Sequence, residues 1–243
     1  MENKLWYLSQ VSLFEAMSMG ELQEIERMIP MAKIPKRTMI QSPDSFREGL
    51  FFLKEGKLRL YKTNVEGKQF TVGILGPGNL FGEIDILSLG TNGLYIETIE
   101  ESLLCSMGKE EAEQFFTERP QLALKMLKVL SEQLKERDAL LEQLALGSVS
   151  DRVLYLLMKL SQKFGRVTGD YLHIDLPLTH QELANMTGVT RESVTVALKE
   201  LARSGMIKTG RKAIKVNRQR AKLPWDEEEG RVRDGTNGRL FRV

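Results

Sequence analysis

Short apolar runs separated by glycine-containing turns fill residues 32–108, and this pattern restricts the fold more than any other feature of the chain. The runs lie at 50–53, 58–61, 70–74, 94–96 and 103–105, and the turns lie at 54–56, 66–67 and 76–78. Many short strands with glycine turns at this spacing are typical of an antiparallel sandwich or barrel. We therefore expect a jelly-roll-like antiparallel β-roll within residues 1–109, with short helical pieces at 12–30.

A helical pattern covers residues 110–146, with an expected break near Pro120. Leucines occupy five of six positions in a stripe of alternating three- and four-residue spacing, and Arg137 occupies the sixth. The five are Leu127, Leu130, Leu134, Leu141 and Leu144. A narrow stripe with charged flanks predicts a coiled-coil dimer through residues 110–147. The alternative is a helix that packs on the core of its own domain.

Positive charge is concentrated in the next segment. Residues 148–222 hold 14 Lys and Arg against 6 Asp and Glu, whereas residues 1–147 hold 17 against 22. Segregated positive charge indicates a polyanion-binding domain, and a solvated lysine-rich surface is the alternative. Residues 223–243 are rich in Gly, Asp, Glu and Arg, which predicts a disordered tail.

Residues 178–207 have the pattern of two short helices joined by a tight turn. Thr179 followed by Glu182 is a capping box that opens the first helix, and Gly188 ends it. Thr190 can cap a second helix over 191–203. This is a helix-turn-helix, and residues 206–216 can add a two-stranded wing that turns at Gly210. The predicted fold class is therefore α+β, with a winged helix-turn-helix domain over 148–222.

The second helix is expected to bury its apolar side and to turn its opposite side outward. At 100° per residue, Arg191, Glu192 and Val196 lie on that outward side. The N-terminal end of a recognition helix meets base edges, where Arg suits guanine and Glu suits cytosine. The helix dipole is an alternative reason for Glu192. The predicted DNA-binding residues are Thr179, His180, Gln181, Thr190, Arg191, Glu192, Ser193, Thr195, Val196, Lys199, Lys208, Arg211 and Lys212.

The order of roll, long helix and winged domain resembles the CRP/FNR family of bacterial transcription regulators over residues 10–220. The local matches are Gly56 and Gly67, the Gly-Asn-Leu-Phe-Gly-Glu stretch at 78–83, and Thr-Arg-Glu-Ser-Val at 190–194. The resemblance implies a homodimer on double-stranded DNA, with RNA polymerase as a partner and a small-molecule effector in the roll. It also implies base reading by Arg191 and Glu192, whereas the family's second base-reading arginine is Val196 here.

The same resemblance places an effector pocket at Gly82, Glu83, Arg137 and Asp138. Members that bind cyclic nucleotides carry an Arg-Ser or Arg-Thr pair after the Gly-Glu, and this chain has Gly93 and Leu94 there. No Lys or Arg occurs between residues 69 and 108, so this stretch supplies no side-chain cation for a buried phosphate. We expect no usual cyclic AMP site. Glu83 could bind a ribose hydroxyl or cap a backbone turn.

Other function classes are disfavoured by composition. One cysteine and two histidines argue against iron–sulfur, zinc and haem sites, so we expect neither metal nor cofactor. Without a long apolar segment or a secretory leader, the chain is expected in the cytoplasm, away from membranes. A nucleotide-binding enzyme, suggested by the glycine-rich loop at 76–82, is the weaker alternative because that loop opens no long helix. Within the regulator class, the roll is either purely structural or binds a different small molecule.

Overall fold

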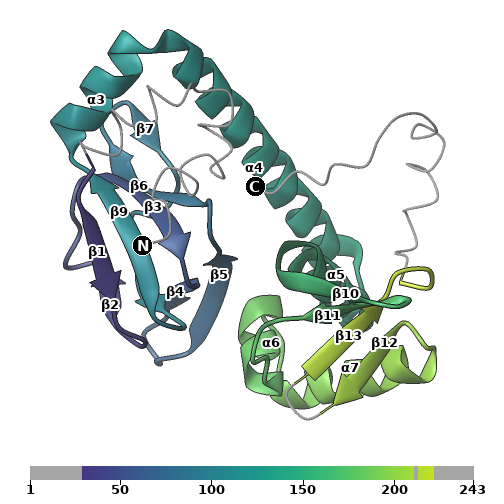
Figure 1. Ribbon diagram of the computed structural model, residues 1–243. Coiled ribbons are helices and arrows are strands. Elements are labelled where there is room, and N and C mark those ends of the chain that lie inside the picture. The colour runs from purple at the N-terminus through teal and green to yellow at the C-terminus, as the bar shows by residue number, and fades with distance from the viewer. Residues whose placement is uncertain (1–28, 211–212, 222–243) are drawn as a thin grey trace. The chain divides into compact units, whose positions relative to one another are not determined.

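The computed structural model describes residues 29–210 and 213–221 (Figure 1). The chain forms two compact units, which divide between Lys135 and Glu136. This boundary lies inside the long helix, whereas the sequence analysis ends the dimerisation helix at residue 147. The predicted helical pieces at 12–30 lie outside the described residues except for the last two positions, and the predicted tail at 223–243 lies outside them entirely.

The described part of the first unit is built on antiparallel strands in two sheets. The sheets have the orders β1-β9-β3-β6-β7 and β2-β8-β4-β5. The strands are β1 (Met31–Ile34), β2 (Met39–Gln41), β3 (Gly49–Glu55), β4 (Leu58–Thr63), β5 (Gln69–Leu75), β6 (Leu80–Ile84), β7 (Leu87–Ser88), β8 (Tyr95–Thr98) and β9 (Ser102–Met107). The predicted antiparallel β-roll is confirmed. The sequence analysis found β3, β4, β5, β8 and β9 and missed the other four.

Apolar side chains from both sheets fill the interior of the roll. Each of these buried Leu, Ile and Phe side chains contributes about 1.5–3 kcal/mol relative to an exposed one. They are Leu53, Leu58, Leu60, Phe81, Leu94, Ile96 and Leu104. A second cluster joins the outer face of the first sheet to the helices that follow, through Leu50, Phe52, Met107, Phe115, Phe116, Leu122 and Met126.

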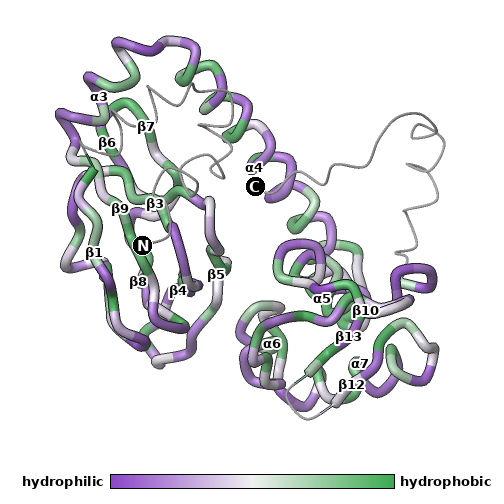
Figure 2. The backbone as a smooth tube through the Cα atoms, viewed as in Figure 1, coloured by the Kyte–Doolittle hydropathy of each residue, from purple (hydrophilic) through white to green (hydrophobic). Residues whose placement is uncertain are grey.

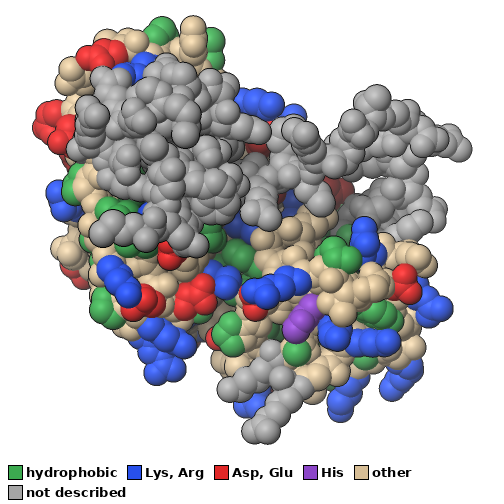
Figure 3. All heavy atoms as spheres, viewed as in Figure 1, with side chains coloured by type: hydrophobic (Ala, Val, Ile, Leu, Met, Phe, Trp, Pro, Cys, Tyr) green, Lys and Arg blue, Asp and Glu red, His purple; other side chains and the backbone are tan. Residues whose placement is uncertain are grey.

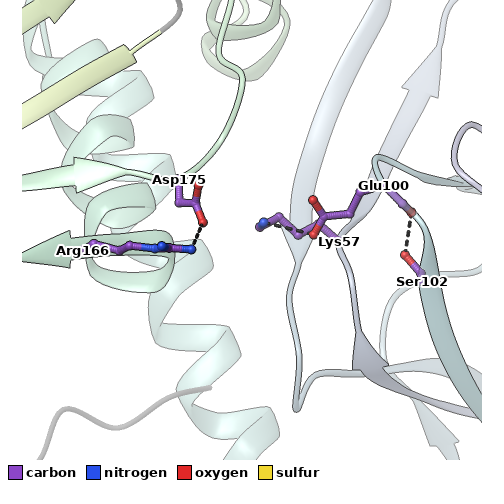
Figure 4. Close-up of polar contacts among 5 residues, drawn as sticks. All are labelled: Lys57, Glu100, Ser102, Arg166 and Asp175. Carbon is purple, nitrogen blue, oxygen red and sulfur yellow. Dashed lines mark hydrogen bonds and ion pairs between the residues drawn. The ribbon is translucent and has the colours of Figure 1, made fainter.

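The β3–β4 turn packs tightly against the β8–β9 turn. Gly56 has φ +88°, and a Cβ on it would lie 2.2 Å from Ser102 Oγ and 2.6 Å from the Glu101 carbonyl oxygen. Beside it, Lys57 Nζ lies 3.0 Å from Glu100 Oε1 (Figure 4). A side chain larger than hydrogen at residue 56 would therefore separate the two turns.

Two helices follow the roll, α3 (Lys109–Glu118) and α4 (Pro120–Leu146). Arg119 between them has φ −130° and ψ 68°, which is not helical, and Pro120 begins the second helix. Proline is tolerated at a first helical position because its missing N–H needs no partner there. The predicted break near Pro120 is confirmed. Figure 2 shows hydrophobic and hydrophilic stretches alternating along α4.

The described residues of the second unit beyond α4 form three helices and a four-stranded sheet of order β10-β11-β13-β12. Its elements are α5 (Val149–Phe164), β10 (Gly165–Thr168), β11 (Tyr171–Ile174), α6 (His180–Thr187), α7 (Arg191–Arg203), β12 (Ile207–Gly210) and β13 (Ala213–Asn217). The predicted helix-turn-helix and two-stranded wing are confirmed. The sequence analysis missed β10 and β11, which extend the wing into a sheet.

Arg152 holds the junction between α4 and α5. Its Nη2 donates to the Leu144 carbonyl oxygen at 2.8 Å and its Nε donates to the Gly147 carbonyl oxygen at 3.2 Å. Ser148 caps α5 through a reciprocal pair of hydrogen bonds with Asp151. The last carbonyls of α4 and the first amides of α5 therefore have partners at the same short turn.

Candidate DNA-binding interface and effector pocket

Capping contacts fix the ends of the two short helices. Thr179 Oγ1 accepts from the Glu182 amide at 3.1 Å, and Glu182 Oε2 accepts from the Thr179 amide, which completes the predicted capping box. Gly188 ends α6 in the left-handed region at φ +70°, where glycine carries no steric cost. Thr190 Oγ1 then accepts from the Ser193 amide at 3.1 Å and opens α7.

Helix α7 buries one side and exposes the other. The buried side consists of Val194, Ala197, Leu198 and Leu201. Arg191, Glu192, Val196 and Lys199 are exposed, so the predicted division between core and outward faces is confirmed. Arg191, Glu192 and Val196 lie in the N-terminal half of α7, which is the part of a recognition helix that meets bases, and Lys199 lies one turn further along.

A hydrogen-bond chain joins the first residue of α6 to α7. Thr195 Oγ1 donates to the Arg191 carbonyl oxygen at 2.9 Å and lies 2.7 Å from His180 Nδ1. The two contacts join the start of α6 to the first turn of α7, whichever atom donates in the His180–Thr195 pair. Two of the predicted DNA-binding side chains, His180 and Thr195, thus bind each other and orient the recognition helix.

Other predicted contacts also have partners within the domain. Gln181 Nε2 donates to Asn185 Oδ1 at 2.9 Å on the exposed side of α6. Thr190 Oγ1 lies 2.9 Å from Ser193 Oγ. Neither pair is buried, so a phosphate oxygen can compete for these donors when DNA is bound. Arg211 and Lys212 lie outside the described residues.

A row of basic side chains crosses the wing sheet, one on each strand. Arg166 on β10 lies opposite His173 on β11, which lies opposite Lys215 on β13, which lies opposite Lys208 on β12. Directly opposite residues of antiparallel strands share a face, so the four side chains, here termed the basic row, project from the same side. Lys208 was among the predicted DNA-binding residues, whereas Arg166 and His173 were missed because their strands were not predicted.

Two contacts flank the basic row. Arg166 Nη2 lies 2.8 Å from Asp175 Oδ2, and Figure 4 shows the two side chains pointing toward each other. At the other end, Lys208 Nζ lies 4.4 Å from the centre of the Tyr171 ring, within cation–π range. Figure 3 shows Lys and Arg side chains gathered over the second unit on the face in view. The sheet therefore offers an electropositive surface to a polyanion.

In the roll, Glu83 supports the loop that follows it. Its Oε1 accepts from the Thr91 amide at 2.5 Å, the Asn92 amide at 2.8 Å and Thr91 Oγ1 at 3.2 Å. Gln41 Nε2 donates to the Thr91 carbonyl oxygen at 2.8 Å from the other side. Glu83 is 8 % exposed. Two roles were predicted for Glu83, binding a ribose hydroxyl or capping a backbone turn, and these hydrogen bonds correspond to the capping role.

Gly82, Gly93 and Leu94, which lie near Glu83 in the sequence, also have structural roles in the roll. Gly82 has φ +116°, and a Cβ on it would lie 2.1 Å from the Gly49 carbonyl oxygen, so strand pairing requires glycine there. Gly93 has φ +72°, a region that an arginine rarely adopts. Leu94 is 2 % exposed and belongs to the roll core. The positions where the family's Arg-Ser pair would stand therefore complete the turn and core of this roll.

Arg59, a cation on a roll strand, does not point into the roll interior. Arg59 lies between Leu58 and Leu60 on β4, and both leucines belong to the core, so Arg59 projects from the opposite face. Its Nε donates to Thr71 Oγ1 and its Nη1 to Gln69 Oε1, each at 2.9 Å. Arg137 and Asp138 are exposed on α4, in the second compact unit.

The leucine stripe on α4 divides into two rows. Leu127, Leu134 and Leu141 are seven residues apart and are 61–62 % exposed. Leu130 and Leu144 are half-buried, and Leu130 packs against the cluster beneath α3 and α4. Leu124 precedes the row and is also exposed, but it lies three residues before Leu127, where the alternation of the stripe would place Ala123.

Over residues 29–210 and 213–221, no cluster of three or more His, Cys, Asp or Glu side chains is placed to bind a metal ion. Within the same ranges, no helix combines the length and apolar character needed to cross a membrane. Cys105 is buried in the roll.

Comparisons with known proteins agree with this architecture. The cyclic nucleotide-binding domain family matches residues 32–119, and the Crp-like helix-turn-helix domain family matches residues 151–221. The cyclic AMP receptor protein of Thermus thermophilus is 30% identical over 170 residues, which cover 70% of this chain and 75% of the relative. The global nitrogen regulator of a Nostoc species is 30% identical over 178 residues, covering 72% and 80%.

Solved structures show the same fold. A CooA mutant from Carboxydothermus hydrogenoformans superposes with a TM-score of 0.70 at 20% identity, covering 90% of this chain and 93% of that one. FixK2 from Bradyrhizobium japonicum superposes with a TM-score of 0.67 at 22% identity, covering 79% and 95%. A sensory-type roll followed by a long helix and a winged helix-turn-helix defines a DNA-binding transcription regulator. The chain belongs to the CRP/FNR family of bacterial transcription regulators.

Proposed function

We propose that this regulator binds a palindromic operator in the bacterial cytoplasm as a homodimer, with α7 of each chain in the major groove. The observation that carries the proposal is the division of α7, which buries its apolar side and leaves Arg191 and Glu192 exposed at its N-terminal end. Two such helices related by a dimer axis read half-sites about 34–36 Å apart. Arg191 suits a guanine edge and Glu192 a cytosine amino group.

The phosphate contacts come from the flanks of α7 and from the wing. Thr179, Thr190 and Ser193 place hydroxyls beside helix N-termini, and Lys199 lies one turn further along α7. The basic row supplies further positive charge. Contacts of this kind position the protein on DNA without reading sequence, so affinity and specificity come from different residues.

The dimer contact lies along α4. The exposed row of Leu127, Leu134 and Leu141 repeats every seven residues, which is the spacing of one coiled-coil seam position. Burial of each leucine against a second copy contributes about 1.5–3 kcal/mol. The exposed leucine row therefore favours association of two chains over a helix that packs only on its own domain.

The effector is not cyclic AMP bound in the family's usual way. Leu94 fills the core where a phosphate-binding side chain would stand, and Arg59 projects from the other face of β4. Relatives of equal identity are named for cyclic AMP in one case and for nitrogen in another, so similarity alone favours neither signal. The roll is then purely structural, or it binds a different small molecule.

This arrangement supports a regulator that controls transcription by RNA polymerase and has no catalytic activity of its own. The glycine-rich loop at 76–79 joins β5 to β6, which are both strands. A phosphate-binding loop of a nucleotide enzyme leads instead into a helix N-terminus. Whether the operator lies in activated or repressed promoters depends on the target genes.

Selection of DNA from a random pool by the purified full chain tests the proposal. We expect a two-fold symmetric motif, and band-shift titrations on it then measure affinity with and without a metabolite extract. An unchanged affinity supports the structural roll, and a changed affinity supports a small-molecule effector. Recovery of no motif, with equal affinity for all DNA, would contradict the proposed function.

A further inference from the structure

Val196 is an exposed apolar residue on an otherwise polar surface. It is 57 % exposed on α7, where its outward neighbours Arg191, Glu192 and Lys199 are charged. In the second unit, over 149–210 and 213–221, the only other large hydrophobic residue of this exposure is Val167 on β10. Val196 lies in the N-terminal half of the recognition helix, whereas Val167 lies on the wing sheet.

The position of Val196 brings it to the same stretch of groove as Glu192. The two residues are four apart on α7, and side chains with this spacing lie about 5–6 Å apart on one helix face. Successive bases of one strand are about 3.4 Å apart along the helix axis. Val196 therefore reaches a base pair within about two steps of the pair that Glu192 reads.

The hydroxyl of Thr195, next to Val196 in the chain, is engaged within the domain, whereas the Val196 side chain faces outward. Thr195 Oγ1 lies 2.9 Å from the Arg191 carbonyl oxygen and 2.7 Å from His180 Nδ1, so its hydroxyl is engaged within the domain. Thr195 is thus a positioning residue. Valine has no donor or acceptor, and the one apolar group that a base presents in the major groove is the 5-methyl of thymine.

We propose that Val196 is a specificity-determining residue that selects thymine by contact with its 5-methyl group. The selected thymine lies within about two base pairs of the pair read by Glu192 in each half-site. This inference rests on the proposed operator binding by α7. It assigns apolar recognition of T·A to a position where an arginine would select guanine.

The test removes one methyl group at a time from the DNA. The operator is first selected from a random pool, and each thymine of a half-site is then replaced singly by deoxyuridine, which differs only by the 5-methyl. For one thymine we expect the affinity of the wild-type chain to fall about four-fold, the value of one buried methylene-sized group. For Val196→Ala the same replacement is expected to change affinity less than two-fold.

Val167→Ala is the matched control, because Val167 is an equally exposed valine of the same unit, and it should respond to deoxyuridine as the wild type does. Val196→Arg should shift the selected base at that position from thymine toward guanine. A selected motif whose thymines can all be replaced without loss overturns the inference while leaving the proposed function intact. So does a loss that persists in Val196→Ala. A pool that yields no motif at all contradicts the proposed function itself.

Discussion

Lys208 on β12 lies directly opposite Lys215 on β13 in the wing sheet, and Lys215 in turn lies opposite His173. Like charges that face each other on neighbouring strands are destabilising. The basic row therefore lowers the stability of the free protein and raises its affinity for a polyanion. Removal of a charge from the basic row should therefore raise the stability of the free protein and weaken its binding to DNA.

Lys215→Gln tests this connection. Removal of the central lysine should raise the melting temperature at low salt, because the repulsion from Lys208 disappears. It should also weaken binding to operator and random DNA alike and reduce the slope of log affinity against log salt by about one. Calorimetry and salt titrations measure the two effects. Lys135→Gln on α4 is a control for the loss of charge alone, and a loss confined to the operator would contradict a phosphate role.

Arg191→Ala should act on sequence recognition. Because Arg191 is exposed at the start of α7, the fold should be unaffected. The variant should lose about 1–3 kcal/mol on the operator and lose its preference at one base pair of each half-site. Titration against single-base operator variants measures this. Equal losses on operator and random DNA, as expected for Lys215→Gln, would show that Arg191 binds only phosphate.

Leu134→Glu should separate the two chains of the dimer. Leu134 is exposed within one chain, so the charge is tolerated by the isolated fold but not at a seam between two copies. We expect monomers by light scattering and loss of operator binding. Lys135→Glu makes a charge change one residue away, off the leucine stripe, and should stay dimeric. A dimeric Leu134→Glu would place the contact elsewhere.

Cyclic AMP should show no binding by calorimetry at micromolar concentrations. An anionic phosphate buried without a cation or an array of amides costs several kcal/mol, and the roll interior has Leu94 where that cation would stand. Operator binding by the same sample shows that the protein is folded. Micromolar affinity that is lost in Arg137→Ala would refute the prediction and identify the substitute cation.

The stability of the second unit should fall at alkaline pH, partly through Tyr155. Burial on α5 raises the pKa of this phenol; Lys159 opposes this rise and Glu136 adds to it, and the net shift is upward. Since the folded-state pKa lies above the unfolded value of about 10, this contribution is complete below that pH and is lost as pH rises through the folded pKa. Melting temperatures between pH 8 and 11 should therefore fall more steeply for the wild type than for Tyr155→Phe. Parallel curves would contradict this.

The elements with strong local signals were predictable from the sequence. The capping box at Thr179 and Glu182, the left-handed Gly188 and the cap at Thr190 all depend on contacts within four residues, and all three are present. The same holds for the strands bounded by glycine turns. Local chemistry was sufficient where the determining partners are neighbours in sequence.

Some of the missed strands depend on partners that are distant in sequence. β1 is mostly exposed and has no apolar alternation, and it pairs with β9, some seventy residues later. β10 and β11 pair with each other across a short turn, but the other edge of β11 pairs with the wing strand β13. The basic row was missed for the same reason, since register places Arg166 and His173 beside the wing lysines.

The contacts of Arg152 have a mechanical consequence. Because Arg152 on α5 donates hydrogen bonds to the carbonyl oxygens of Leu144 and Gly147, the turn at Gly147 does not rotate freely. The last turns of α4 belong to the same compact unit as the recognition helix. A rotation of the last turns of α4 would therefore be transmitted to α5, because Arg152 joins the two helices.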